Sequence, residues 1–145
     1  MIISFDLDDT LISKSKFELE KETVIHKLFG IESIRIGTIK LFKELRAKNH
    51  KIYIYTTSFR SKARIKLMFY SYGIPVDFVI NQQKHEIEVT KSGKNVSKYP
   101  PKFGIDIHVD DSLGVEMEGE KYGFKTIIIS EKDKNWTETI LNRIK

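Results

Sequence analysis

Five short apolar runs, rich in β-branched residues, recur along the chain and are separated by stretches with helical periodicity. The runs are residues 2–5, 51–56, 76–80, 105–109 and 125–129. In most of the intervening stretches, apolar side chains recur every three or four residues. Strands that alternate with helices favour right-handed crossovers, which produce a mostly parallel sheet covered on both faces. The sequence therefore predicts an α/β fold with three layers around a mostly parallel five-stranded sheet.

The ends of several predicted helices can also be placed. A helix is expected within residues 37–50, and two more are expected over 61–73 and 112–123, each ending in a glycine suited to a helix C-cap. The last helix is expected to begin at Asn135, with Glu138 three residues later as in a capping box.

Two segments follow neither period cleanly. The segment 13–36 is compatible with a helix over Phe17–Phe29 or with a small hairpin. Residues 82–99 are expected to form a short hairpin that turns at Ser92 and Gly93. Both segments are shorter than the about 50 residues that an independent domain usually needs, so residues 1–145 are expected to form one domain.

Composition narrows the class of protein. The chain is 40% hydrophobic and 31% charged, and no apolar stretch approaches the about 20 residues of a membrane span. It has no cysteine, which excludes disulfides, thiolate metal sites and a cysteine nucleophile. The start lacks the pattern of a secretory signal, so we expect a cytoplasmic protein. The net charge of +5 is compatible with phosphorylated or nucleic-acid partners.

The first apolar run ends abruptly in three carboxylates, Asp6, Asp8 and Asp9. Two carboxylates about 4 Å apart repel each other by roughly 4 kcal/mol at the effective dielectric of a protein surface. Such a cluster is unfavourable unless a cation or protons compensate it. We therefore expect a positive partner at this position, and we interpret Asp9 as a cap or surface acid.

Polar residues also follow other predicted strands. In parallel α/β sheets, ligands bind beyond the carboxyl ends of the strands. The candidates placed there are Asp6, Asp8, Thr56, Thr57, Ser58, Asp110 and Asp111, with Lys98 and Lys102 shortly before the fourth strand. Carboxylates gathered without sulfur ligands or a histidine cluster favour a hard cation such as Mg²⁺.

In this setting FDLDDTL resembles the first signature of the haloacid dehalogenase (HAD) superfamily, an Asp-x-Asp-x-Thr loop after an apolar strand. The other three signatures follow in order. IYIYTTS is similar to the second, a lysine before the fourth strand to the third, and IHVDDS to the fourth. The resemblance spans residues 2–130 and implies a Rossmann-like, HAD-like fold in a small member without a full cap domain.

The resemblance also implies roles for individual residues. Asp6 would attack phosphorus and become an aspartyl phosphate, while Asp8 would act as general acid and then as general base. Thr56 would bind the phosphoryl group, and Lys98 would neutralise its charge and orient Asp6. Apart from the resemblance, Thr57 and Arg60 follow the second strand at the edge that carries the acids, so we expect them to contact the substrate.

The Mg²⁺ ion implied by the resemblance would bind the Asp6 carboxylate, the Asp8 backbone carbonyl and Asp111, with Asp110 acting through water. We prefer Lys98 to Lys102 as the signature lysine. Lys102 lies close to the start of the fourth strand, and the length of that strand would carry it far from Asp110.

The implied activity is Mg²⁺-dependent hydrolysis of a phosphomonoester. Since segments 13–36 and 82–97 are too short for a cap, we expect a macromolecular or bulky phosphorylated substrate that covers the open site itself. A basic rim is expected from Arg60, Lys62, Lys91 and Lys94. The oligomeric state is not specified by the sequence.

Three alternatives are weighed against this interpretation. The first is a phosphatase of small nucleotide or sugar phosphates that is capped by oligomerisation, and phosphoryl transfer in place of hydrolysis is a variant of it. The second is a non-catalytic nucleic-acid-binding protein, which gives no reason for the acids. A phosphoacceptor receiver domain is disfavoured because Asn81 and Gln82 follow the third strand, where its acceptor Asp is needed. His108 is interpreted as a packed structural residue.

Overall fold

The computed structural model describes residues 1–144, and in that part of the chain it contains one five-stranded sheet with the order β3-β2-β1-β4-β5. All four strand pairs are parallel. The strands are β1 (Ile2–Phe5), β2 (Lys51–Tyr55), β3 (Phe78–Ile80), β4 (Ile107–Asp110) and β5 (Lys125–Ile128). The predicted α/β class and the five predicted strands are confirmed, with bounds that shift by two residues or fewer.

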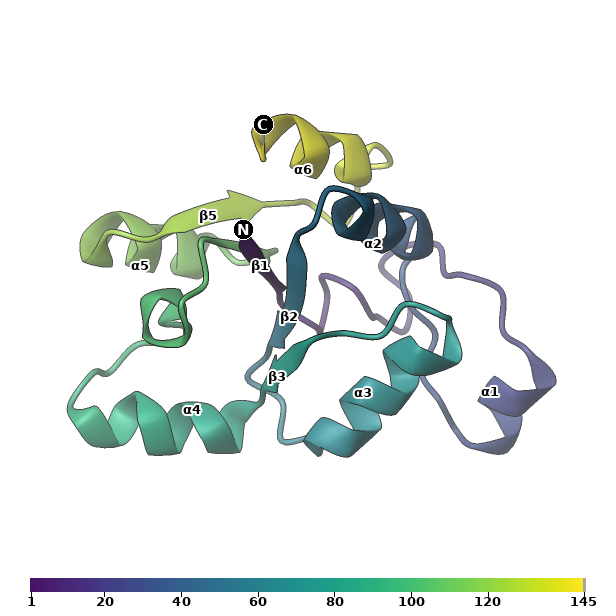
Figure 1. Cartoon of the computed structure of the whole chain (residues 1–145), viewed down its shortest axis with the longest axis horizontal. Coiled ribbons are helices and arrows are strands. Elements are labelled where there is room, and N and C mark those ends of the chain that lie inside the picture. The colour runs from purple at the N-terminus through teal and green to yellow at the C-terminus, as the bar shows by residue number, and fades with distance from the viewer. Residues whose placement is uncertain (145) are drawn as a thin grey trace.

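Helices cover both faces of the sheet and give the predicted three layers. The α-helices are α1 (Val24–Leu28), α2 (Thr38–Ala47), α3 (Lys62–Ser71), α4 (Gln82–Glu88), α5 (Leu113–Tyr122) and α6 (Trp136–Arg143). Two short 3₁₀ helices are η1 (Thr90–Ser92) and η2 (Pro100–Phe103). In Figure 1, α2, α3 and α6 lie on one side of the sheet, and α4 and α5 lie on the other. None of the helices in residues 1–144 combines the length and apolarity needed to cross a membrane.

The larger part of the core lies between the sheet and α2, α3 and α6. Phe5 of β1 packs against Phe42 with ring centroids 4.9 Å apart, and Phe42 packs against Phe69 of α3 at 5.6 Å. The other face carries a smaller apolar cluster of Tyr55, Ile80 and Ile105. Fully burying an aromatic or aliphatic side chain contributes about 1.5–3 kcal/mol, so these contacts hold the central strands in one register.

That register aligns the carboxyl ends of the strands that carry the candidate site. Phe5 pairs with Ile54 of β2 and with Val109 of β4. The next residue, Asp6, continues the ladder by donating its N–H to the Val109 carbonyl at 2.8 Å. The acids after β1 and β4 are thereby brought to the same edge of the sheet, as the parallel arrangement predicts.

The predicted hairpin over residues 82–99 is wrong, because this segment forms α4 and η1. Asn81 caps α4 by accepting a hydrogen bond from the Lys84 N–H at 3.1 Å. The pair Lys84–Glu88 adds an i,i+4 contact on the exposed side. The ring of His85 is buried between the Tyr55 hydroxyl at 2.6 Å and the Val96 carbonyl at 2.9 Å. Capping and a buried polar anchor thus override the weak alternation of the sequence.

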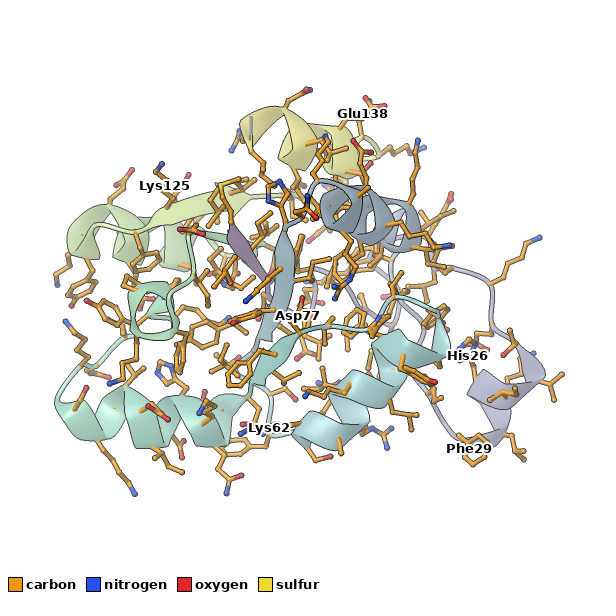
Figure 2. The ribbon with its side chains drawn as sticks, viewed as in Figure 1. His26, Phe29, Lys62, Asp77, Lys125 and Glu138 are labelled. Carbon is orange, nitrogen blue, oxygen red and sulfur yellow. The ribbon has the colours of Figure 1, made fainter. Side chains whose placement is uncertain are left out.

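Segment 13–36 was compatible with a helix or a small hairpin, and the structure contains a short piece of each. The helix over Phe17–Phe29 is wrong, since only α1 is helical and Thr23 caps it. At the base of the segment, Glu20 N–H donates to the Ile34 carbonyl and Ile36 N–H donates to the Glu18 carbonyl, both at 2.8 Å, so the ends pair as in a small hairpin. Phe29 lies at the outer edge of the molecule (Figure 2). The segment is a single looped arm, and no full cap domain is present in residues 1–144.

The predicted capping box at Asn135 is also wrong, although the position of the helix start is right. The Asn135 side chain makes no capping hydrogen bond. Asp133 replaces it by accepting from the Asn135 N–H at 2.8 Å and from the Thr139 hydroxyl at 3.0 Å. The cap is therefore formed by an acid two residues earlier.

Candidate active site

Three buried side chains form the centre of the site. Lys98 Nζ lies 2.7 Å from Asp6 Oδ1 and 3.3 Å from Asp110 Oδ2. All three residues are buried, with exposed fractions of 2% for Lys98, 7% for Asp6 and 2% for Asp110. A lysine amine among two carboxylates can neutralise only one of them. The centre therefore retains negative charge inside the protein.

Burial and the neighbouring charges shift the pKa values of Asp6 and Asp110 in opposite directions. Burial raises the pKa of Asp6 to about 7, with Lys98 opposing and Asp110 reinforcing this rise. For Asp110 burial also acts upward, but the hydrogen bond from His108 and the charge of Lys98 bring its pKa to about 2. Burial likewise works against the charge on Lys98, yet Asp6 and Asp110 raise its pKa above the ordinary value. Of these two aspartates, Asp6 at the end of β1 thus has the higher proton affinity.

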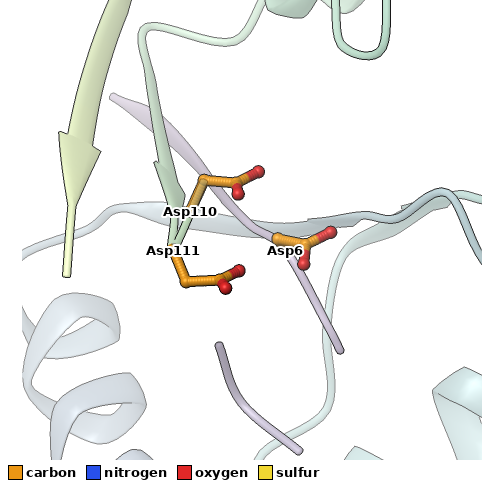
Figure 3. Close-up of side chains that lie close together, drawn as sticks. All are labelled: Asp6, Asp110 and Asp111. Atoms are coloured by element: carbon orange, nitrogen blue, oxygen red, sulfur yellow. The ribbon is translucent and has the colours of Figure 1, made fainter. Parts of the chain in front are cut away.

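A third acid completes an oxygen-rich cluster. Asp6, Asp110 and Asp111 each offer a carboxylate oxygen, and these three atoms all lie within 4.8 Å of one another. Figure 3 shows the three carboxylates side by side at the ends of β1 and β4. Asp111 accepts a hydrogen bond from the Thr10 hydroxyl at 3.1 Å, and burial raises its pKa. The donor set fits a hard divalent cation, because three carboxylates face one another and Lys98 compensates only part of their charge.

Asp110 is held by a chain of hydrogen bonds that the sequence interpretation did not include. His108 Nε2 lies 2.9 Å from Asp110 Oδ2, and His108 Nδ1 lies 2.7 Å from the Ser4 hydroxyl. The Ser112 N–H donates to the other Asp110 oxygen at 2.9 Å. His108 is fully buried, as its interpretation as a packed residue expects. The register of β1 with β4 pairs Ser4 with His108, which a sequence cannot reveal without knowing that the two strands are neighbours.

Asp8 points to the rim of the site instead of its interior. Its side chain is 49% exposed and lies 3.0 Å from Arg60 Nη1. Arg60 is also bound to Glu32 of segment 13–36 at 2.8 Å. The structure therefore brings Arg60, predicted to contact substrate, into contact with the predicted general acid.

The remaining predicted residues are placed as follows. Thr56 is buried, and its hydroxyl accepts from the Ser58 N–H at 3.0 Å, while the neighbouring Thr57 is exposed. Lys102 is exposed on η2. Only Lys98 of the two candidate lysines contacts Asp6 among the described residues. The preference for Lys98 therefore agrees with the geometry.

The expected basic rim is only partly free. Lys62, at the start of α3 (Figure 2), and Lys91 in η1 are exposed. Lys94 lies over the Tyr99 ring at 4.4 Å, and Arg60 is engaged by acids. Asp9, interpreted as a surface acid, pairs with Lys16 at 3.0 Å.

The sequence matches no protein-family model and no curated protein. The chemistry of the site therefore has to be argued from its own geometry. A buried carboxylate held by a lysine, beside two further acids and a hydroxyl-bearing loop, is suited to accept a group of high negative charge once a cation is bound.

Proposed function

We propose that the chain is a Mg²⁺-dependent phosphomonoester hydrolase of the HAD superfamily that works through an aspartyl phosphate on Asp6. The observation that carries the proposal is the contact of Asp6 with Lys98 beside Asp110 and Asp111. It joins the residues of three of the four signatures at one edge of the sheet. The segments where a cap could be inserted are too short for one, and the four signatures follow in the family's order along the chain. Both features support the same assignment.

In the first step, a carboxylate oxygen of Asp6 attacks phosphorus, and the bond from phosphorus to the leaving oxygen breaks. Lys98 holds Asp6 Oδ1 and offers its charge to the phosphoryl group. Thr56, at the end of β2, would donate its hydroxyl to a phosphoryl oxygen. Asp8 gives its proton to the leaving oxygen, so that an alcohol departs in place of an alkoxide.

In the second step, Asp8 takes a proton from a water molecule, and that water attacks the phosphorus of the aspartyl phosphate. Inorganic phosphate leaves and the Asp6 carboxylate is regenerated. The exposure of Asp8 suits both steps, because the leaving group and the water have to reach it from solvent.

Asp6, Asp111 and the backbone carbonyl of Asp8 are the groups that would hold Mg²⁺. When bound, the ion supplies positive charge for the developing negative charge of the transferring phosphoryl group. Both oxygens of Asp110 already accept hydrogen bonds from the protein, which suits a contact through water. Lys98 and the ion would together compensate the three acids.

We further propose a substrate that is macromolecular or bulky. Segment 13–36 has no helix beyond α1, and residues 82–97 form α4, η1 and the start of the loop that follows, so neither forms a cap domain. Water weakens electrostatic stabilisation at an open site, and a large substrate excludes that water itself. The alternative is a small phosphate covered by a second copy of the chain.

The direct test is a phosphatase assay on metal-free protein with p-nitrophenyl phosphate. Activity should appear on addition of Mg²⁺ and disappear in Asp6→Asn. Glu86→Gln, the same change of a carboxylate on exposed α4, serves as the matched control and should keep full activity. Full activity in Asp6→Asn, or activity indifferent to chelation, would refute the proposal.

A further inference from the structure

We propose that Arg60 is a positioning residue for Asp8 and that Glu32 fixes Arg60 in turn. This inference rests on the proposed function, since it concerns the general acid of that reaction. It replaces the expectation that Arg60 binds the substrate.

All three guanidinium nitrogens of Arg60 donate to groups of the protein. Nη1 lies 3.0 and 3.1 Å from the two oxygens of Asp8 and 2.8 Å from the Ser58 hydroxyl. Nε and Nη2 form a two-pronged contact with Glu32 at 2.8 and 2.9 Å. A paired guanidinium–carboxylate contact of this kind fixes direction as well as distance. The contact of Nε and Nη2 with Glu32 therefore fixes the orientation of the guanidinium, and with it the position at which Nη1 binds Asp8.

Asp8 depends on this contact for its orientation. Within residues 1–144, Arg60 supplies both hydrogen bonds that the Asp8 carboxylate receives. The side chain is half-exposed and directly precedes Asp9, which adopts a φ of 63°. An unanchored Asp at such a position would sample several rotamers, and a general acid acts only when it lies within hydrogen-bond reach of the leaving oxygen.

The contact also ties the arm of segment 13–36 to the reaction. Glu32 lies on that arm, Ser58 and Arg60 follow β2, and Asp8 follows β1, so three separate segments meet at one guanidinium. A cavity of about 460 Å³ is lined by Asp8, Arg60 and Glu32 together. Asp8 therefore lies between Asp6 and this cavity in the proposed reaction, and the arm forms the far wall of the cavity.

Leaving-group chemistry separates positioning from the other roles that Arg60 could have. An alkyl leaving oxygen needs a proton in the transition state, whereas p-nitrophenolate departs without one. The value of kcat/KM reports steps up to the first irreversible phosphoryl transfer and excludes hydrolysis of the aspartyl phosphate. Misplacing Asp8 should therefore lower kcat/KM for an alkyl phosphate and spare it for the aryl phosphate.

The experiment compares phosphoserine with p-nitrophenyl phosphate in Arg60→Gln, Glu32→Gln and the control Arg143→Gln, which makes the same change at an exposed position of α6, all assayed with Mg²⁺. We expect Arg60→Gln to lower kcat/KM about 30-fold or more for phosphoserine and less than about threefold for p-nitrophenyl phosphate, because a misplaced Asp8 loses part of the about 10²–10⁴-fold that general acid catalysis contributes. Glu32→Gln should shift the ratio in the same direction by a smaller factor. Arg143→Gln should leave the ratio unchanged, and the inhibition constant for inorganic phosphate should stay within about threefold throughout.

Each other outcome is decisive. Equal losses on both substrates would overturn the positioning role, and equal losses with a weakened inhibition by phosphate would return Arg60 to substrate binding. If Arg60→Gln does not fold, an unchanged ratio in Glu32→Gln would also overturn it. Wild-type protein without Mg²⁺-dependent activity on either substrate would refute the proposed function itself, which is a separate and recognisable result.

Discussion

At the scale of single residues, the centre of the molecule is a compromise between stability and chemistry. Asp6, Asp110 and Lys98 are buried together, although burial of charge is costly unless each charge is paired. Lys98 is shared between two acids, so its single positive charge cannot balance both of them. Such an arrangement is expected where a bound cation or a phosphoryl group completes the balance.

The two lysines before β4 give a matched pair of variants. Lys98→Ala should lower kcat by about 10²-fold or more, because the charge held 2.7 Å from Asp6 is lost from the transition state. Lys102→Ala removes the same side chain from the exposed surface of η2 and should change kcat less than about twofold. Steady-state kinetics on one substrate measures both kcat values. A larger loss in Lys102→Ala than in Lys98→Ala would assign the phosphoryl-binding role to Lys102.

The raised pKa of Asp6 predicts how stability depends on pH. Its folded-state value of about 7 exceeds that of an unfolded aspartate, which is near 3.9. Between these values the folded protein retains a proton that the unfolded chain has lost, so stability falls as pH rises through about 7. Metal-free Asp6→Asn should therefore have a higher Tm than wild type at pH 8, and the difference should shrink toward pH 5.

Differential scanning calorimetry measures these Tm values, and adding Mg²⁺ to the same samples checks the explanation. Mg²⁺ at pH 8 should raise the Tm of wild type more than that of Asp6→Asn, since the ion compensates the charge that destabilises the metal-free state. A wild-type Tm that rises from pH 5 to pH 8 relative to the variant would contradict the assignment of a high pKa to Asp6.

At the scale of secondary-structure elements, the sequence predicted what depends on local pattern. Runs such as residues 2–5 and 105–109 are mostly apolar, and the strands that they form are largely buried on both faces, so their strand character and parallel pairing follow from composition. The order of acids at their ends then places Asp6 near Asp110. Helix α4 could not be predicted in this way, because it depends on the contact of His85 with Tyr55, thirty positions away.

The candidate site also contains some contacts that the sequence pattern predicts and others that it does not. Reasoning about strand direction favours Lys98 over Lys102, and in the structure Lys98 Nζ lies 2.7 Å from Asp6 Oδ1. The Glu32–Arg60–Asp8 and Ser4–His108–Asp110 contacts join residues from segments whose pairing the sequence does not specify. Long-range polar contacts of this kind carry no periodic signal, so only a folded structure reveals them.

The anchor of α4 can be tested by removing it. His85→Ala should lower the free energy of unfolding by about 1–3 kcal/mol, because the Val96 carbonyl loses its buried donor and Tyr55 loses a partner. Glu86→Ala, on the exposed side of the same helix, should change it by less than about 0.5 kcal/mol. Urea unfolding measures both, and equal effects would show that the buried ring does not hold the helix.

At the scale of the whole molecule, the absence of a cap domain in residues 1–144 leaves open the edge of the sheet that carries the candidate site. A bulky substrate that approaches it meets exposed Lys62 and Lys91. We expect kcat/KM to be higher for a phosphopeptide or an end-phosphorylated oligonucleotide than for a small sugar phosphate. The preference should weaken with salt, because exposed charges are screened beyond about 10 Å at 0.1 M ionic strength.

The basic rim supplies the variants for that comparison. Lys62→Glu with Lys91→Glu should reduce the preference for the macromolecular substrate while leaving hydrolysis of p-nitrophenyl phosphate intact. A monomer that prefers a small metabolite and is indifferent to salt and to both changes would refute the macromolecular substrate.

The central claim is that Asp6 becomes covalently phosphorylated, and acid-quench mass spectrometry tests it most directly. Protein mixed with Mg²⁺ and p-nitrophenyl phosphate, quenched in acid and digested, should carry one phosphoryl group on the peptide that contains Asp6. That modification should be absent without Mg²⁺ and in Asp6→Asn. A turning-over enzyme with no phosphorylated aspartate, or with the phosphoryl group on another residue, would contradict the account.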